Sequence, residues 1–383
     1  MPSSTSQQFG LLPIRSRIYR FIYYSNSFCS KQDIAKNCDI SMPTLYQNLT
    51  QLMDAGLICY SGEERSTGGR RAQGLDIIPD ARFAIGISVS EHHLRLVLTD
   101  LRLKELFYRS VPFRFKDSVS DKTSDLLSLQ HTLPEILEEF LYDHRVDRSR
   151  LLGAGITIPA LITPDHARIH IAPTLNLRDV SLSSLTEGIP YPVYVENDAT
   201  ASGFAEGFVR GGRPNLAYFS LEYGVGGAVL MQGLPYGGDN AQSGEFGHMC
   251  LEPGGLPCSC GKTGCMEAYC SPLRIEKTFG VTLEEFFRGV EVHRPDYEAL
   301  LYDMLRHLAI AVNNVHMLLD CDVVLGGILA EYLRPYLPVL KDYVLAGNPF
   351  RDNADYVKLS AIPRHNAPLG AALHFVQEFV SGI

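Results

Sequence analysis

The sequence predicts an α/β protein that carries a small helical module at its N-terminus. Two observations predict this organisation. From residue 75 onward, strand-like runs alternate with helical stretches, whereas residues 1–74 hold three short helical patterns and one strand-like run. The chain of 383 residues is also too long for one ordinary hydrophobic core. We therefore expect two or three domains.

The composition is that of a soluble globular protein. Hydrophobic residues make up 45% of the chain and charged residues 20%. The polar opening and the arginines in the first apolar stretch exclude a signal peptide and a membrane span, so we expect a cytoplasmic protein without membrane insertion. Nine cysteines, an odd number, then suit free thiols or metal ligands better than a disulfide framework.

Charge is unevenly distributed along the chain. The net charge is −9, but residues 1–74 hold eight Lys and Arg against five Asp and Glu, which gives +3 there and −12 elsewhere. A weakly basic module on an acidic body can contact phosphate locally while the body repels nucleic acid. The charge distribution therefore permits DNA binding by the N-terminal module.

Three helical patterns begin the N-terminal module. Apolar residues at helical spacing predict a helix over residues 14–24. Ser30 precedes Asp33 in the pattern that caps a helix start, so a short second helix is expected before a turn over residues 37–40. Ser41 then caps a third helix, whose leucines face one side.

A strand and a basic loop follow the third helix. Residues 57–60 predict a strand, and residues 66–71 predict a glycine-rich hairpin tip. The order helix, turn, helix, wing is typical of a winged helix-turn-helix, which places its recognition helix in the major groove of DNA. The expected DNA contacts are Ser41, Met42, Thr44, Tyr46, Gln47, Asn48, Arg70 and Arg71. A small protein-interaction module is the alternative that this pattern leaves open.

Strand and helix patterns alternate through the rest of the chain. Strands are predicted over residues 83–89, 94–99, 151–158, 193–195, 216–221, 227–231, 323–325 and 356–361. Helices are predicted over residues 125–144, with an interruption at Pro134, and over residues 199–209, 283–288, 297–319 and 367–379.

One histidine and three cysteines form the strongest chemical motif. His248 is followed by Cys258, Cys260 and Cys265 with the spacing H-x9-C-x-C-x4-C. Three thiolates and an imidazole suit tetrahedral Zn²⁺, and the intervening glycines let the chain turn tightly enough to bring them together. A closed set of four protein ligands leaves no position for a reactive water, so the predicted zinc is structural. Chance clustering of thiols is the alternative.

Acidic residues flank this motif. Asn197 and Asp198 follow a predicted strand, and Glu245 and Glu267 lie close in sequence to the histidine and the last cysteine. Strand ends and metal-braced loops are common places for ligand sites in α/β proteins, and carboxylates that accept hydroxyl hydrogens suit a sugar. Solvated surface acids are the alternative for each residue.

Three short motifs carry a resemblance that covers nearly the whole chain. They are residues 196–199 (ENDA), 245–248 (EFGH) and 265–267 (CME). In these motifs the chain resembles the ROK family of repressors, open reading frames and sugar kinases. Its wing, residues 66–71, is similar to the repressor branch, whose regulators respond to xylose, N-acetylglucosamine or glucose status. The resemblance implies an actin-like, ribonuclease-H-type fold of two α/β lobes, with sugar in the cleft and zinc beside it.

We accordingly expect three parts. These are a winged helix-turn-helix over residues 1–74, a first lobe over residues 75–200 and 361–383, and a second lobe with the zinc loop over residues 201–360.

The resemblance also implies roles for single residues. It makes Asn197, Asp198, Glu245, His248 and Glu267 sugar contacts, with the histidine joining zinc and sugar through its two ring nitrogens. In the family's kinases, the aspartate at position 198 is the base that deprotonates the attacking hydroxyl.

One sugar contact of the family is missing. Thr174 stands where the family usually has an asparagine. Either Asn176 substitutes for that amide, or the pocket prefers a different ligand.

The phosphate-binding turns of the family's kinases are altered here. Those kinases hold ATP with an Asp-x-Gly-Gly-Thr turn, in which Ser88 now replaces the acid, side chains replace both glycines, and Glu91 adds negative charge. In the second phosphate loop, Glu222 replaces a glycine. Because phosphoryl transfer depends on positioning and charge neutralisation, we expect no catalysis and a vestigial base at Asp198.

These features predict a transcriptional regulator, a repressor of carbohydrate metabolism genes. We expect a homodimer or dimer of dimers that binds double-stranded operator DNA, and a small sugar whose binding closes the cleft and changes the spacing of the DNA-binding modules. Two alternatives stay open. One is an ATP-dependent hexose or N-acetylhexosamine kinase with a DNA-binding arm, and the other is a regulator controlled by a protein partner.

Overall fold

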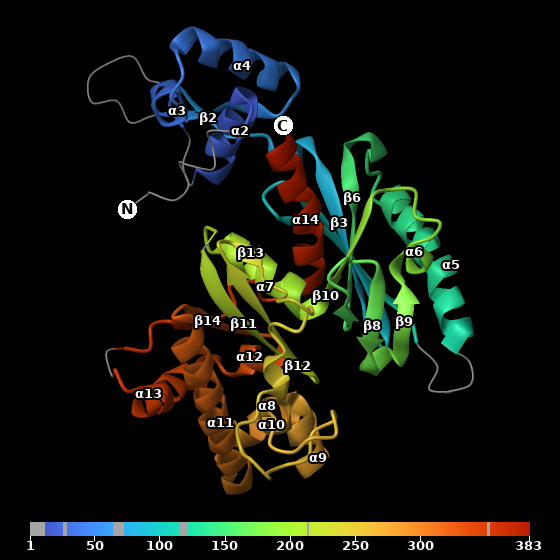
Figure 1. Cartoon of the computed structure of the whole chain (residues 1–383), viewed down its shortest axis with the longest axis vertical. Coiled ribbons are helices and arrows are strands. Elements are labelled where there is room, and N and C mark those ends of the chain that lie inside the picture. Colours follow the sequence, from blue (N-terminus) through green and yellow to red (C-terminus); the bar gives the residue numbers. More distant parts are fainter. Residues whose placement is uncertain (1–11, 26–28, 64–72, 115–121, 213, 351–352) are drawn as a thin grey trace.

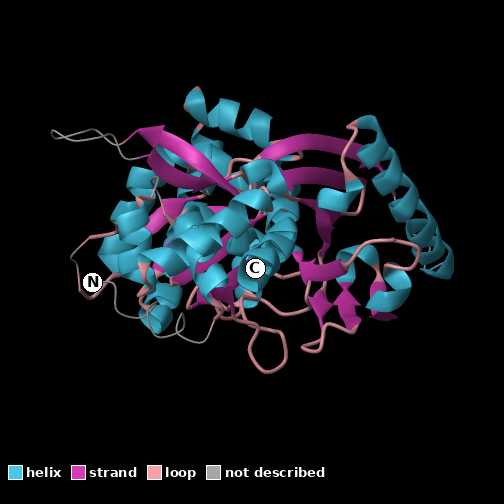
Figure 2. Ribbon diagram, turned by 90° about the horizontal axis from the view of Figure 1, so that it is seen from above, coloured by secondary structure: helices cyan, strands magenta, loops and turns pink. Residues whose placement is uncertain are grey.

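The computed structural model of the chain describes residues 12–25, 29–63, 73–114, 122–212, 214–350 and 353–383. A small N-terminal module sits on a larger body that contains two five-stranded sheets (Figure 1). Viewed from above, helices and strands occur together across the whole body (Figure 2). The predicted α/β class is therefore confirmed. No helix of the described residues has the length and apolar character needed to cross a membrane.

The described residues of the N-terminal module form three helices and a two-stranded antiparallel sheet. Its elements are α2 (Ile14–Tyr24), α3 (Lys31–Cys38), α4 (Met42–Asp54), β1 (Ile58–Glu63) and β2 (Gln73–Ile77). Both predicted caps are present, because Ser30 Oγ accepts the N–H of Asp33 at 3.1 Å and Ser41 Oγ accepts the N–H of Thr44 at 3.4 Å. α3 extends two residues into the expected turn and ends where Asp39 adopts a left-handed conformation.

The first sheet of the body has the order β10-β6-β3-β4-β5. Its strands are β3 (Phe83–Val89), β4 (His93–Asp100), β5 (Glu105–Pro112), β6 (Leu151–Ile158) and β10 (Val193–Asn197). β10, β6 and β3 are parallel, and β4 and β5 continue the sheet antiparallel. Side chains alternate between its faces: Ile85 and Ile87 pack with α5 (Lys122–Asp143), and Ala84 packs with α14 (Asn366–Gly382).

α5 is one continuous helix, so the interruption expected at Pro134 is wrong. A proline removes one backbone hydrogen bond and opposes the helix at that point. Leu133 and Leu137, on either side of it, are buried against the first sheet. This packing stabilises both halves of the helix, as tertiary contacts generally do for helices in proteins.

Several short elements of the first half have no counterpart among the predicted segments. They are the edge strand β5 and a three-stranded sheet of β7 (Leu161–Ile162), β8 (Arg168–Ala172) and β9 (Leu177–Ser181), followed by α6 (Leu182–Leu185). The three strands are only two to five residues long, too short for a periodic pattern to stand out.

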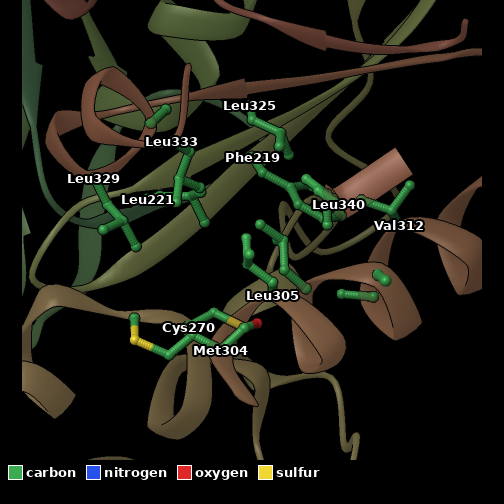
Figure 3. Packing of buried hydrophobic residues seen from close by; sticks show 14 of the residues in the cluster. Phe219, Leu221, Cys270, Met304, Leu305, Val312, Leu325, Leu329, Leu333 and Leu340 are labelled. Atoms are coloured by element: carbon green, nitrogen blue, oxygen red, sulfur yellow. The ribbon is translucent and has the colours of Figure 1, made fainter. Parts of the chain in front are cut away.

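The second sheet repeats the topology of the first, with the order β13-β12-β11-β14-β15. Its strands are β11 (Asn215–Leu221), β12 (Val225–Met231), β13 (Leu234–Pro235), β14 (Asp322–Gly326) and β15 (Val357–Leu359). Phe219 and Leu325 pack against Leu305 and Val312 in the core of this half (Figure 3). The helices of this half are α8 (Met266–Cys270), α9 (Pro272–Phe279), α10 (Leu283–Glu291), α11 (Pro295–Leu319), α12 (Ile328–Tyr332) and α13 (Leu337–Gly347).

Two helices, α7 (Asp198–Val209) and α14, lie between the sheets (Figure 1). They approach so closely that a Cβ on Gly370 of α14 would lie 1.8 Å from the carbonyl oxygen of Ala201. A Cβ on Gly203 would lie 2.6 Å from Ala228 in the second sheet, so α7 packs closely against both α14 and the second sheet. Two sheets of the same topology with two helices between them form the expected actin-like fold.

The predicted lobe boundary between residues 200 and 201 falls inside α7. Since this helix contacts α14 as well as β11 and β12, it connects the two halves. The division into three parts stays a prediction.

The N-terminal module packs directly on the body through α2. The hydroxyl of Tyr23 donates to the carbonyl of Leu101 at 2.6 Å, and the hydroxyl of Tyr24 donates to Gln377 of α14 at 2.6 Å. The buried face of α2 shares one apolar cluster with residues of α7 and α14. The module and the body therefore have a continuous core.

Candidate ligand site, metal cluster and DNA-facing surface

The four predicted metal ligands meet in the structure. Single ligand atoms of His248, Cys258, Cys260 and Cys265 all lie within 4.8 Å of one another. The Sγ atoms of Cys260 and Cys265 are 3.8 Å apart, and Sγ of Cys258 lies 3.8 Å from Nδ1 of His248. Metal–sulfur bonds of about 2.3 Å in a tetrahedron require ligand separations of about 3.8 Å. The group could therefore hold a four-coordinate metal ion.

The cysteine loop depends on glycine at two turns. Gly261 and Gly264 have φ angles of 85° and 81°, in the left-handed region that L-residues with a side chain seldom adopt. A Cβ on Gly264 would also lie 1.8 Å from the carbonyl oxygen of Glu252. These glycines bring the thiols to one point, as the sequence predicts.

Three carboxylates lie beside this group. Glu245 precedes the short turn Phe246–His248, Glu267 occupies the first turn of α8, and Asp198 begins α7. Glu267 accepts the N–H of Val225 at 3.1 Å and the hydroxyl of Ser259. Sequence-distant acids are thus brought to one place by the metal loop and α7.

The pKa values of two of these carboxylates are shifted by their surroundings. Burial raises the pKa of Asp198, although the N–H of Ala199 opposes the rise. Burial also raises the pKa of Glu245, and the charges of Asp198 and Glu267 add to that rise while His248 opposes it. Each carboxylate therefore gains from a bound hydroxyl group that donates hydrogen bonds to it.

The two predicted amides have different surroundings. Asn197 caps α7 by accepting the N–H of Thr200 at 2.9 Å, and its NH₂ group donates to the carbonyl of Ala160 at 3.0 Å. One N–H of this amide remains for a ligand. Asn176 is exposed in the turn before β9, and within the described ranges no side-chain contact connects it to the carboxylates.

At the second altered phosphate turn, a carboxylate of the protein itself accepts a backbone N–H that could otherwise bind a phosphate. Glu222 accepts the N–H of Ile328, the first residue of α12, at 3.0 Å. Burial raises the pKa of Glu222 to about 7, and the nearby charge of Asp198 contributes to the rise. Ser88 is half-buried, and Glu91 pairs with His92 at 3.8 Å.

The predicted DNA contacts on α4 are only partly free. Met42, Tyr46 and Gln47 are exposed. Asn48 is half-buried and donates to the carbonyl of Thr44 at 2.8 Å, so its amide is partly engaged within the helix. Ser41 is exposed while it caps the helix. Arg70 and Arg71 of the predicted wing lie outside the described residues.

Two further residues on this surface were not predicted from the sequence. Lys31 lies at the first position of α3, with its Nζ 4.8 Å from the ring centre of Tyr46 and 5.2 Å from that of Tyr60. Lys31 directly follows the Ser30 cap, and Tyr60 lies two residues after the buried Ile58 in a strand. The cap position was a signal for Lys31, whereas strand alternation places Tyr60 on the same face as Ile58 and gave no signal that it would be exposed.

In the comparison with protein families, residues 84–377 match the model of the ROK family. The xylose repressor of Bacillus subtilis (strain 168) is 30% identical over 257 residues, which are 66% of this chain and 64% of that protein. The DNA-binding transcriptional dual regulator NagC of Escherichia coli (strain K12) is 26% identical over 253 residues, 65% of this chain and 60% of NagC. The matches span less than two thirds of these relatives' own lengths.

Two solved structures share the fold. A ROK family transcriptional regulator, a homolog of the E. coli MLC protein, has a TM-score of 0.77 at 21% identity, with 96% of each chain covered. The ROK hexokinase from Thermus thermophilus has a TM-score of 0.60 at 24% identity and covers 78% of this chain and 100% of its own. The hexokinase resembles only part of the chain, whereas the regulator resembles nearly all of it.

Proposed function

Because this chain belongs to the ROK family, we propose that it is a sugar-controlled transcription regulator that represses carbohydrate metabolism genes. Relatives named as repressors support this proposal. A homodimer or dimer of dimers binds double-stranded operator DNA, with the recognition helix α4 of each module in one half-site.

The observation that carries the proposal is that one helix joins the carboxylate site to the DNA-binding module. Asp198 is the first residue of α7, and Phe208, near its end, contacts Tyr23 of α2 with ring centres 6.2 Å apart. A helix of 12 residues is about 18 Å long. A ligand that moves Asp198 therefore moves the surface on which α2 rests.

The contact between the module and α14 supports a second position for the module. Tyr19 of α2 packs edge-on against Phe379 with ring centres 6.3 Å apart. The Tyr19 hydroxyl is fully buried and has no hydrogen-bond partner among the described residues. An unsatisfied buried hydroxyl costs about 1–3 kcal/mol. This cost lowers the free energy with which α2 is held in its present position, which suits a module that shifts when a ligand binds.

The metal cluster acts as a structural zinc site in this proposal. His248 and the three cysteines would hold the ion, which would fix the segments that carry Glu245 and Glu267. Nδ1 of His248 lies 3.8 Å from Sγ of Cys258 and would be its ligand atom, so Nε2 would be left for a ligand hydroxyl. A sugar that also donates a hydroxyl to Asp198 connects this braced segment to α7.

Phosphoryl transfer is not part of the proposed function. A nucleotide phosphate needs backbone N–H donors and cations, but Glu222 already occupies the N–H of Ile328 and brings a carboxylate to that position. Asp198 then serves as a sugar contact only, because no nucleotide phosphate is bound for the sugar hydroxyl to attack.

The test measures how strongly sugar and operator binding are coupled. A thermal-shift screen of monosaccharides, N-acetylated sugars, sugar phosphates and ATP identifies the effector, and fluorescence anisotropy then gives operator affinity with and without it. We expect the effector to change wild-type operator affinity roughly 5- to 150-fold. Phe208→Ala should retain the sugar-induced thermal shift and lose most of this change. Val209→Ala, at an exposed position of the same helix, is the matched control.

Other outcomes would favour the alternatives. ATP-dependent turnover of a hexose would establish a kinase. If none of the sugars shifts the melting temperature and a protein partner changes operator affinity instead, the regulator answers to that partner.

A further inference from the structure

A lysine and two tyrosines form a cluster on the DNA-facing surface of the N-terminal module. Lys31 begins α3, Tyr46 lies on the recognition helix α4, and Tyr60 lies on β1. The Lys31 Nζ lies 4.8 Å and 5.2 Å from the two ring centres. Tyr46 is 50% exposed and Tyr60 is 47% exposed, so the cluster lies at the surface. We call these three residues the tyrosine–lysine cluster.

We propose that Lys31 binds a backbone phosphate of double-stranded DNA and that Tyr46 and Tyr60 position it for this contact. The inference rests on the proposed DNA-binding function. It adds two residues, Lys31 and Tyr60, to those expected from the sequence, and it changes the role of Tyr46 from a direct DNA contact to a residue that orients a cation.

The first argument is the absence of an internal partner for the ammonium group. Within the described residues, no carboxylate oxygen lies within 4.0 Å of Lys31 Nζ in an ion pair. Asp33, two residues away on the same helix, is engaged with Ser30, whose hydroxyl donates to it at 2.6 Å. Lys31 therefore presents a charge that no carboxylate among the described residues of its module neutralises.

The second argument is pre-organisation. A surface lysine normally samples many rotamers, and ordering it costs side-chain entropy. The two cation–π contacts of Lys31 offset part of that cost before DNA arrives. The ordered ammonium then meets a phosphate with less loss of freedom than a mobile one would.

The third argument is location. In helix-turn-helix proteins, the helix before the recognition helix crosses the DNA backbone while the recognition helix lies in the major groove. Lys31 begins α3, and its Nζ lies over a ring of α4, so its charge stands where the two helices meet. The phosphodiester backbone beside the groove is the anion that this geometry suits.

The experiment compares two lysines of one helix. Lys31→Gln and Lys36→Gln each remove one charge from α3, but Lys36 is exposed in the last turn and has no ring contact among those described. Operator affinity is measured by fluorescence anisotropy at salt concentrations from about 50 to about 200 mM, because the slope of affinity against salt reports the number of phosphate contacts. We expect Lys31→Gln to weaken operator binding about tenfold and to reduce the salt slope by about 0.9 for each half-site, or about 1.8 for a dimer that loses one phosphate contact in each of its two half-sites. Lys36→Gln should leave the slope unchanged.

A third variant tests the role of the ring. Tyr60→Leu keeps the charge of Lys31 and removes one cation–π contact, so operator affinity should fall less than in Lys31→Gln while the salt slope stays near the wild-type value. Equal slopes for Lys31→Gln and Lys36→Gln would overturn the inference. If wild-type protein fails to bind any duplex DNA, the proposed function fails first, and the two results are therefore distinguishable.

Discussion

Carboxylates have different roles in two regions of the body, the region around the metal cluster, called the metal side, and the region around Glu222 at the altered phosphate turn, called the phosphate side. Near the metal cluster, burial raises the pKa of both Asp198 and Glu245, and the charge of Asp198 adds to the rise at Glu245. At the second phosphate turn, Glu222 instead accepts a backbone N–H of α12. Under the proposed function, this difference means that the fold has kept a site for a hydroxylated ligand and has lost the site for a nucleotide.

The physical reason lies in the charge of the two ligands. A neutral sugar offers hydroxyl donors, so a group of carboxylates recognises it by accepting hydrogen bonds. A triphosphate offers only acceptors and negative charge, so it needs free N–H groups and cations. A carboxylate such as Glu222 therefore helps the first kind of site and destroys the second.

The largest expected effect comes from removing a metal ligand on the metal side. Cys265→Ser leaves an incomplete ligand set, and we expect loss of the bound metal and a fall in melting temperature of roughly 10 °C, since a structural zinc contributes several kcal/mol to stability. Metal content by mass spectrometry and thermal melting measure both. Cys250→Ser is the matched control, because Cys250 is exposed and does not belong to the ligand group. A Cys265→Ser protein that keeps one metal ion per chain would contradict the assignment.

A smaller effect is expected at the ligand carboxylate of α7. Asp198→Asn replaces a charged acceptor by a neutral one of the same shape, and hydrogen bonds to charged groups contribute about 1.5–3 kcal/mol. Sugar affinity, measured by calorimetry, should therefore fall roughly 10- to 100-fold. Operator affinity without sugar should stay within about twofold of wild type, because Asp198 lies at the start of α7, at the opposite end from the contact with the N-terminal module. An unchanged sugar affinity would remove Asp198 from the ligand site.

The smallest expected effect lies on the phosphate side and depends on pH. Folded Glu222 has a pKa of about 7, whereas its ordinary value is 4.5. Between these values the folded protein holds a proton that the unfolded chain has released. This contribution to stability is therefore fully present below about pH 4.5 and is lost as pH rises through about 7.

The variant Glu222→Gln removes this titration. Its melting temperature relative to wild type should rise between pH 5 and pH 8, and thermal melts across that range measure the difference. Parallel curves for the two proteins would show that Glu222 titrates normally in the folded state.

Much of the local structure was predictable from short-range signals. The caps at Ser30 and Ser41 and the strand over residues 83–89 follow from neighbouring residues, and the structure contains them. The histidine and cysteine spacing was also informative, because glycine turns fix a loop of 18 residues with few alternatives. The family resemblance then supplied the arrangement of two lobes, which propensities alone do not determine.

Other features escaped prediction because they depend on contacts between distant segments. Pro134 is tolerated because the first sheet supports the helix on both sides of it. The amide of Asn197 is largely used in capping α7 and in bonding to Ala160, which no motif indicates. Lys31 gains a role only because α4 and β1 bring Tyr46 and Tyr60 beside it.

Local signals in the sequence were enough for most of the longer helices and strands and for the residues that could hold a metal ion, since caps, periodicity and ligand spacing act over a few residues. Only the tertiary structure decided that Asp198 and Phe208 lie at opposite ends of one helix whose far end supports the DNA-binding module. Only it decided that Glu222 uses an N–H 106 residues away. These relations depend on packing between sheets and helices, and packing brings together residues whose separation along the chain carries no signal.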